Sequence, residues 1–278
     1  MNPKPLLVLL AVGSVLATAP AAERWSLLRP KPDNALRELS TDRPDKTESP
    51  YTVDAGHYQV ESDLVTYARD RADGVTTERL SLAATNLKVG LLDDVDLQVV
   101  VEPYVGVRSR GEADGTSDTK TGIGDTTVRL KVNWWGNDGG DTAFATMPFV
   151  KLPTNQDDLG NDDVEGGLIM PLALSLPRGW SLGTMLEVDV DRDADDQGYH
   201  AVVIVSVTAG HAIVGDLSGY AELLSESSLE SGVGWVGYGD VGLTYRLGSD
   251  VQLDAGVNVG LNSDAEDINP FIGFSARL

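Results

Sequence analysis

Apolar residues at every second position recur in about a dozen short segments between His57 and Leu278. Successive side chains of a β-strand point to opposite faces, so each segment predicts a strand with one apolar and one polar face. The clearest is 95–108, whose faces read Val95, Leu97, Val99, Val101, Val105, Val107 and Asp96, Gln98, Glu102, Tyr104, Arg108. This segment is as long as a tilted strand that crosses a bilayer, which needs roughly 9–11 residues.

The whole pattern predicts twelve strands joined by links that alternate between short and long. We expect strands at 57–69, 76–91, 95–108, 123–135, 142–153, 164–176, 180–190, 198–209, 216–225, 232–246, 251–262 and 268–278. Short links are expected at 92–94, 136–141, 177–179, 210–215 and 247–250, and longer polar links at 70–75, 109–122, 154–163, 191–197, 226–231 and 263–267. Short periplasmic turns and longer external loops are typical of outer-membrane barrels. The predicted fold class is therefore all-β, a closed antiparallel transmembrane β-barrel of about twelve strands over 57–278.

Residues 1–22 have the pattern of a secretory signal peptide. Lys4 precedes an apolar run at 6–16, and small residues at 19–22 offer a cleavage site. No later stretch has the roughly 18 apolar residues of a membrane-spanning helix, so a membrane-embedded form has to be a barrel. We expect the bacterial outer membrane as the location, with a water-soluble exported β protein as the competing interpretation. Lipid, lipopolysaccharide and the barrel-insertion machinery are then the expected partners, together with a small-molecule solute.

Composition excludes several other functions. The chain has 43 acidic and 21 basic residues and a formal net charge of −22, which argues against binding to nucleic acid. It has no cysteine, so disulfides and thiolate chemistry are excluded.

Residues 23–56 differ from the rest of the chain because they are rich in proline and mixed charges. Proline removes hydrogen-bond donors from a β-ladder, so we expect an extended segment outside the sheet, in the periplasm or inside one end of the barrel. Its densest part is the motif Thr41, Asp42, Arg43, Pro44, Asp45, Glu48, Ser49 and Pro50. Two interpretations stay open: a plug or latch that pairs with charges of the barrel wall, and a simple tether to the first strand.

Ionisable residues on the polar faces are the candidates for lining the lumen. They are Glu61, Asp63, Glu102, Arg108, Arg129, Lys131, Lys151, Glu187, Asp189, Asp240 and Asp254. Paired charges could brace the wall, and the same residues could line a water-filled or gated path and set its selectivity.

Motifs for chemistry are weak. Gly179–Gly183 matches the G-x-S-x-G nucleophile pattern but opens a predicted strand instead of a strand-turn-helix elbow. Asp191, Asp193, Asp195 and Asp196 resemble the start of a calcium loop, but its later ligands are missing. The three histidines lie on separate predicted elements, without the spacing of a metal site. We therefore expect no catalytic residue, no metal and no cofactor.

Several short motifs resemble a known family. Thr41–Asp45, Glu48–Pro50, Gly56–Glu61, Gly122–Asp125 and Lys151–Thr154 are similar to landmarks of a family of bacterial outer-membrane proteins. That family is named for the meta pathway of phenol degradation and is described as transporters. The resemblance covers the chain from about Ser40 to the end. It implies an outer-membrane barrel and uptake of aromatic or other hydrophobic compounds.

The function that we expect is therefore passage of small, aromatic or hydrophobic molecules through an outer-membrane barrel, without enzymatic chemistry. Two alternatives remain. A lumen filled by ion pairs would favour a structural or adhesion barrel with a closed lumen. A serine and a histidine within hydrogen-bond reach near the outer rim would be required for an outer-membrane lipid hydrolase.

Overall fold

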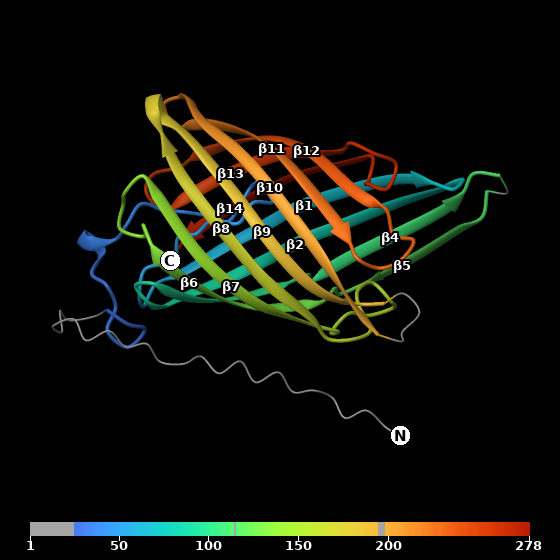
Figure 1. Ribbon diagram of the computed structural model, residues 1–278, viewed down its shortest axis with the longest axis horizontal. Helices are drawn as coiled ribbons and strands as arrows, with labels where there is room; N and C mark the ends of the chain where they lie inside the picture. The colour runs from blue at the N-terminus through green and yellow to red at the C-terminus, as the bar shows by residue number, and fades with distance from the viewer. Residues whose placement is uncertain (1–24, 114, 194–197) are drawn as a thin grey trace, which may run out of the picture.

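The computed structural model describes residues 25–113, 115–193 and 198–278 (Figure 1). The predicted signal peptide at 1–22 lies outside these residues. The described elements are η1 (Asp33–Ala35), β1 (Tyr58–Ala72), β2 (Val75–Leu92), β3 (Val95–Val101), β4 (Tyr104–Gly111), β5 (Ser117–Gly122), β6 (Thr126–Trp135), β7 (Thr142–Leu152), β8 (Glu165–Leu176), η2 (Pro177–Gly179), β9 (Trp180–Arg192), β10 (Tyr199–Val214), β11 (Leu217–Ser228), β12 (Trp235–Arg246), β13 (Val251–Gly260) and β14 (Ile268–Arg277). No helix among the described residues is long and apolar enough to span a membrane.

The strands form one closed antiparallel barrel. From β6 to β14, consecutive strands pair with each other, and β1 pairs with both β2 and β14, which closes the wall. The first half of β2 pairs with β4 and its second half with β3. Further along the chain, β4 pairs with β5 and β3 with β6. The fourteen strand segments therefore make a twelve-strand barrel, because β3–β4 and β5–β6 are two strands that are each interrupted once. The predicted fold class is confirmed.

The interruption in β3–β4 corrects the prediction of one strand at 95–108. Proline cannot donate to the ladder, and Pro103 stands between the two halves. Beyond it the faces exchange: Val105 is fully buried, whereas Tyr104 and Arg108 are exposed. Arg108 therefore lies on the opposite face from Val105 and does not line the lumen. The prediction that 123–135 is one strand and 109–122 is a link also changes, because β5 occupies 117–122.

The links follow the predicted alternation, with one clear exception. Short turns at 93–94, 136–141, 177–179, 215–216 and 247–250 lie at one end of the barrel, and the links that follow β4, β7, β9, β11 and β13 begin at the other. The link predicted at 70–75 is only Asp73-Gly74, and both residues have positive φ, at 52° and 75°. An Asp-Gly pair in this conformation is the preferred two-residue hairpin turn, so β1 and β2 run on to the tip.

The two faces of the wall have opposite character. Outward side chains that are exposed include Leu168, Leu186, Val205, Leu223, Val241, Leu253 and Ile272. Inward side chains that are buried include Glu61, Lys88, Asp96, Gln98, Lys131, Glu222, Asp240 and Asp254. A water-soluble protein would have the reverse arrangement, since large exposed apolar surfaces are rare in soluble monomers. The wall therefore faces hydrocarbon outside, and the protein is an integral barrel of the bacterial outer membrane.

Candidate functional site

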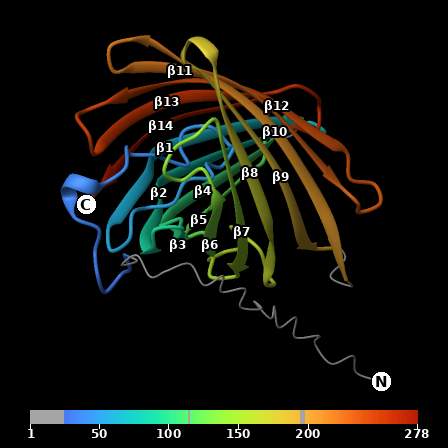
Figure 2. The ribbon, with the colours of Figure 1, turned by 60° about the vertical axis from the view of Figure 1, so that its left-hand side comes forward.

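The segment 25–56 enters the barrel from the end with the short turns. Leu27 donates its backbone N–H to Leu91 O at 2.8 Å, and Ala55 forms a bridge with Gly90 at the end of β2. Both views show the blue N-terminal segment at the same end as the C-terminus (Figure 2). Gly90 is required for this approach, because a Cβ there would lie 2.1 Å from Asp54 O. The N-terminal segment is thus packed against the end that, by the length of its turns, faces the periplasm.

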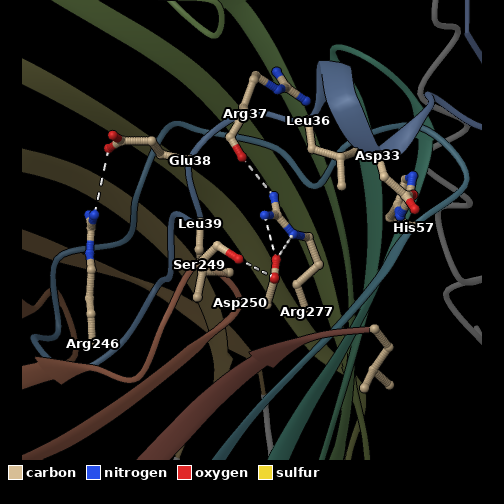
Figure 3. Close-up of a pocket in the computed structure, with 11 residues that line it drawn as sticks. Asp33, Leu36, Arg37, Glu38, Leu39, His57, Arg246, Ser249, Asp250 and Arg277 are labelled. Carbon is tan, nitrogen blue, oxygen red and sulfur yellow. Dashed lines mark hydrogen bonds and ion pairs between the residues drawn. The ribbon is translucent and has the colours of Figure 1, made fainter.

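Charged side chains fix this segment at the rim, around a cavity of about 710 Å³ (Figure 3). Arg277 pairs with Asp250 at 2.6 Å and donates to the backbone oxygen of Arg37 at 2.7 Å. Within the segment itself, Lys31 and Arg37 form ion pairs with Asp54 at 2.9 and 2.7 Å. Burial alone would raise the pKa of Asp54, but these two cations outweigh it and hold that pKa below its usual value. Asp54 is therefore ionised, and its ion pairs hold the two ends of the segment 31–54 together.

Residues 41–50, which we call the lumen loop, lie inside the barrel. Asp42 is at their centre, and its carboxylate contacts Lys88 on β2 and Lys131 on β6 at 2.5 Å each. Its backbone N–H donates to Glu61 on β1 at 3.1 and 3.2 Å, and Glu61 in turn pairs with Lys88. Burial alone would raise the pKa of Asp42, but Lys131 and Lys88 outweigh it and lower that pKa well below its usual value. Two anions and two cations thus form a closed network that joins the loop to the wall.

The lumen loop also contacts other strands of the wall. Arg43 pairs with Asp63 on β1 at 2.5 Å and with Asp254 on β13 at 2.6 Å. Thr47 donates its backbone N–H to Glu222 on β11 at 2.8 Å.

The side chains of Thr47 and Glu48 make two more contacts with the wall. The hydroxyl of Thr47 lies 2.6 Å from that of Ser206 on β10, and Glu48 pairs with Arg129 on β6 at 2.6 Å. The loop therefore spans the lumen between walls that lie far apart in the sequence.

Two acidic groups of the loop lack a cation that outweighs their burial. Burial and the nearby Glu222 raise the pKa of Asp45 to about 8. Burial likewise raises the pKa of Glu48, and the attraction of Arg129 offsets only part of this effect. Asp45 is therefore protonated in the docked loop at neutral pH, in contrast to Asp42.

The predicted lumen residues fall into three groups. Glu61, Asp63, Arg129, Lys131 and Asp254 contact the lumen loop. Lys151, Glu187, Asp189 and Asp240 lie on the inward face without such a contact; Lys151 is 3.8 Å from Glu165, and Asp240 is directly across from Glu222. Glu102 pairs with Arg79 at 3.2 Å beside the strand break, and Arg108 points away from the lumen.

Lys88 was missed by the sequence analysis, although it belongs to the network around Asp42. It shares the polar face of the predicted strand 76–91 with Asn86, and this alternation was the signal that could have found it.

An apolar cluster interrupts the polar interior. Met147 on β7, Ile169 on β8 and Met185 on β9 are buried together, with Phe149 and Ile204 packed against them. The lumen loop lies beside it, since the backbone N–H of Glu48 is 3.5 Å from the sulfur of Met185. An apolar surface inside the barrel can receive an apolar molecule, which a purely charged lumen cannot do.

Comparisons with known proteins agree with this architecture. A model of the family described as "Putative MetA-pathway of phenol degradation" matches residues 41–278. The fold is similar to an outer membrane channel from Pseudomonas putida F1, with 13% identity, a TM-score of 0.63, and coverage of 86% of this chain and 100% of that one. The translocator domain of the autotransporter NalP from Neisseria meningitidis is 11% identical with a TM-score of 0.43, over 80% of this chain and 88% of that one. No curated protein gives a significant match.

Proposed function

Because the chain belongs to this phenol-degradation family and folds as an outer-membrane barrel, we propose that it conducts small hydrophobic or aromatic molecules across the outer membrane. In this proposal the lumen loop is a plug that closes the periplasmic half of the barrel and moves aside for the solute. The proposal needs no catalytic residue and no cofactor.

The position of the lumen loop is the observation that carries the proposal. Asp42 holds the loop to one wall, and Arg43 and Thr47 hold it to others. A wall that only needed bracing could use pairs between its own strands, as Arg79 and Glu102 do. A charged loop that is inserted through one end, by contrast, occupies the path that a solute would take.

The solute class rests on two supports. The apolar cluster around Met147, Ile169 and Met185 offers a surface that would bind an apolar molecule once the loop has moved. The family is named for phenol degradation, and the similar barrel from Pseudomonas putida F1 is described as a channel.

A structural barrel with a closed lumen is the second candidate. The buried network of Asp42, Glu61, Lys88 and Lys131 favours it, because ion pairs fill the lumen at that level.

The hydrolase alternative has no comparable support. Among the described residues, His57 is bonded to Lys31 O, His200 to Asp193, and His211 to Ala212 O and Arg178 O, and none of these partners is a serine.

Solute flux into liposomes tests the proposal. Purified protein is compared with a variant that lacks residues 23–56, using an aromatic solute and a neutral sugar of similar size. We expect the aromatic solute to enter with both forms, and faster without the N-terminal segment, whereas protein-free liposomes give the background. Flux at background level with both forms would exclude passage and leave the structural barrel.

A further inference from the structure

Three side chains of metal-ligand type meet at the end of the barrel with the long links. Asp193 directly follows β9, His200 is the second residue of β10, and Glu230 follows β11. One ligand atom from each lies within 4.8 Å of the other two. The described residues contain no other group of three such side chains at this distance.

The backbone holds these three residues in place. Asp193 donates its N–H to Gly198 O at 3.1 Å, so the residues that flank the tip of the β9–β10 link are bonded to each other. Leu229 donates its N–H to Ala201 O at 2.9 Å, which fixes Glu230 beside the start of β10. The three positions are therefore set by backbone hydrogen bonds at the ends of β9, β10 and β11.

The distances match the shell of a small divalent ion. His200 Nδ1 lies 3.0 Å from Asp193 Oδ1 and 3.9 Å from Glu230 Oε2. Tetrahedral zinc with ligands at about 2.0–2.1 Å separates neighbouring ligand atoms by about 3.3–3.4 Å. The two distances from His200 differ from this spacing by about 0.3–0.6 Å, the Asp193 and Glu230 oxygens lie within 4.8 Å of each other, and water could complete the shell.

Burial and charge favour the same ion. The side chains of His200, Asp193 and Glu230 are 13%, 25% and 21% exposed, so they are shielded from bulk water but remain within reach of an ion. The two carboxylates balance the charge of a divalent cation, and Asp191, directly across from His200 on β9, adds a further negative charge. One nitrogen and two oxygen ligands suit Zn²⁺, whereas Ca²⁺ takes 6–8 oxygen ligands.

We propose that Asp193, His200 and Glu230 form a zinc site that joins the β9–β10 and β11–β12 links at the external mouth of the barrel. Zinc replaces the proton that His200 Nδ1 shares with Asp193, and this proton is released to the surrounding water. The bound ion ties the two links together through their side chains. This site is independent of the lumen loop, which lies toward the opposite end.

Calorimetric titration of the full-length mature protein in detergent, stripped with a chelator, tests the site with zinc chloride as the probe. The variants are His200→Ala and Glu230→Gln. The matched control is His211→Ala, because His211 lies at the other end of β10 and is bonded to the backbone oxygens of Ala212 and Arg178. Heat-dependent gel mobility verifies that each variant is a folded barrel.

We expect one Zn²⁺ per wild-type chain and an affinity at least about ten-fold lower in both variants, because loss of even an outer-shell partner costs 10–100-fold. The control should bind as the wild type does. Wild-type protein that binds no zinc would overturn the proposal. Equal affinity of the His200 variant, or displacement of zinc by equimolar Ca²⁺, would also overturn it, because the ion would then be held by acidic groups of the links alone.

Discussion

Replacing Asp42 with asparagine removes the charge at the centre of the network that holds the lumen loop. In the wild type, Asp42 and Glu61 balance Lys88 and Lys131, and the Asp42 side chain is 6% exposed. After the substitution Asp42→Asn, Glu61 is the one described carboxylate that still contacts either buried lysine, and Asp96, directly across from Lys131, makes no ion pair with them. Removing one partner of a buried ion pair costs about 3–5 kcal/mol.

The lower end of that range applies here, because an amide oxygen can still accept one hydrogen bond from a lysine. A cost of about 3 kcal/mol shifts the ratio of docked to released loop by more than 10², at about 1.4 kcal/mol for each factor of ten. In the released state the missing carboxylate costs the lysines less free energy, because water fills the space that the loop leaves and hydrates them. The variant should therefore release its loop far more often while its barrel stays folded.

Single-channel recording in planar bilayers measures this shift as the fraction of time spent open. We expect a rise of roughly 100-fold for Asp42→Asn, until the open state dominates. Asp158→Asn is the matched control, since Asp158 in the link after β7 pairs with Lys120 on β5, and both side chains are exposed. The open fraction of the double variant Asp42→Asn/Lys131→Met should return toward the wild-type value, because the charges of Lys88 and Glu61 then balance each other. An open fraction in Asp42→Asn equal to that of the control would refute the reasoning.

Three further predictions test other parts of the structure. The pKa of Asp45 is about 8 in the docked loop and has its usual value of 3.8 when the loop is released, so Asp45 takes up a proton when the loop docks. Docking therefore weakens by about 1.4 kcal/mol for each pH unit as the pH rises from about 4 to 8. Conductance should therefore increase between pH 6 and 8, and Asp45→Asn should flatten this profile. Arg43→Met leaves Asp254 buried without its cation and should weaken docking of the lumen loop by about 3 kcal/mol. Single-channel records should show this as a higher open fraction. Leu186→Arg on the outward face should cost about 2–4 kcal/mol in urea unfolding from liposomes, whereas Glu187→Gln on the inward face should cost far less.

Alternation and turn chemistry made most of the barrel predictable from the sequence. Strands such as β7 and β13 follow the two-residue period closely, because one face meets lipid and the other meets the lumen. The period failed at Pro103, where a local break reverses the faces, so Arg108 was assigned to the wrong side. The predicted strands 57–69 and 76–91 were also too short at the hairpin that joins β1 and β2, because the Asp73-Gly74 turn was interpreted as part of a polar loop.

The site was predictable only in part. The dense charges of 41–50 marked the lumen loop, and the polar faces marked Glu61 and Lys131, but nothing in one dimension tells which wall residue meets which loop residue. Asp42 and Lys131 are 89 positions apart and meet only because barrel closure sets the register of every strand. The same holds for His200 on β10, whose neighbours Asp193 and Glu230 come from two different links and have no fixed spacing in the sequence.

A disulfide between the lumen loop and the wall tests most directly whether solute passage requires the loop to move. The hydroxyls of Thr47 and Ser206 lie 2.6 Å apart, and the chain has no cysteine of its own, so Thr47→Cys/Ser206→Cys would form one defined cross-link. Flux of an aromatic solute into liposomes is measured with the oxidised and the reduced protein, with each single variant as a control. We predict background flux when the bond is formed and recovery of flux after reduction. Equal flux in the oxidised and reduced double variant would contradict the account, because a fixed loop would then leave the path open.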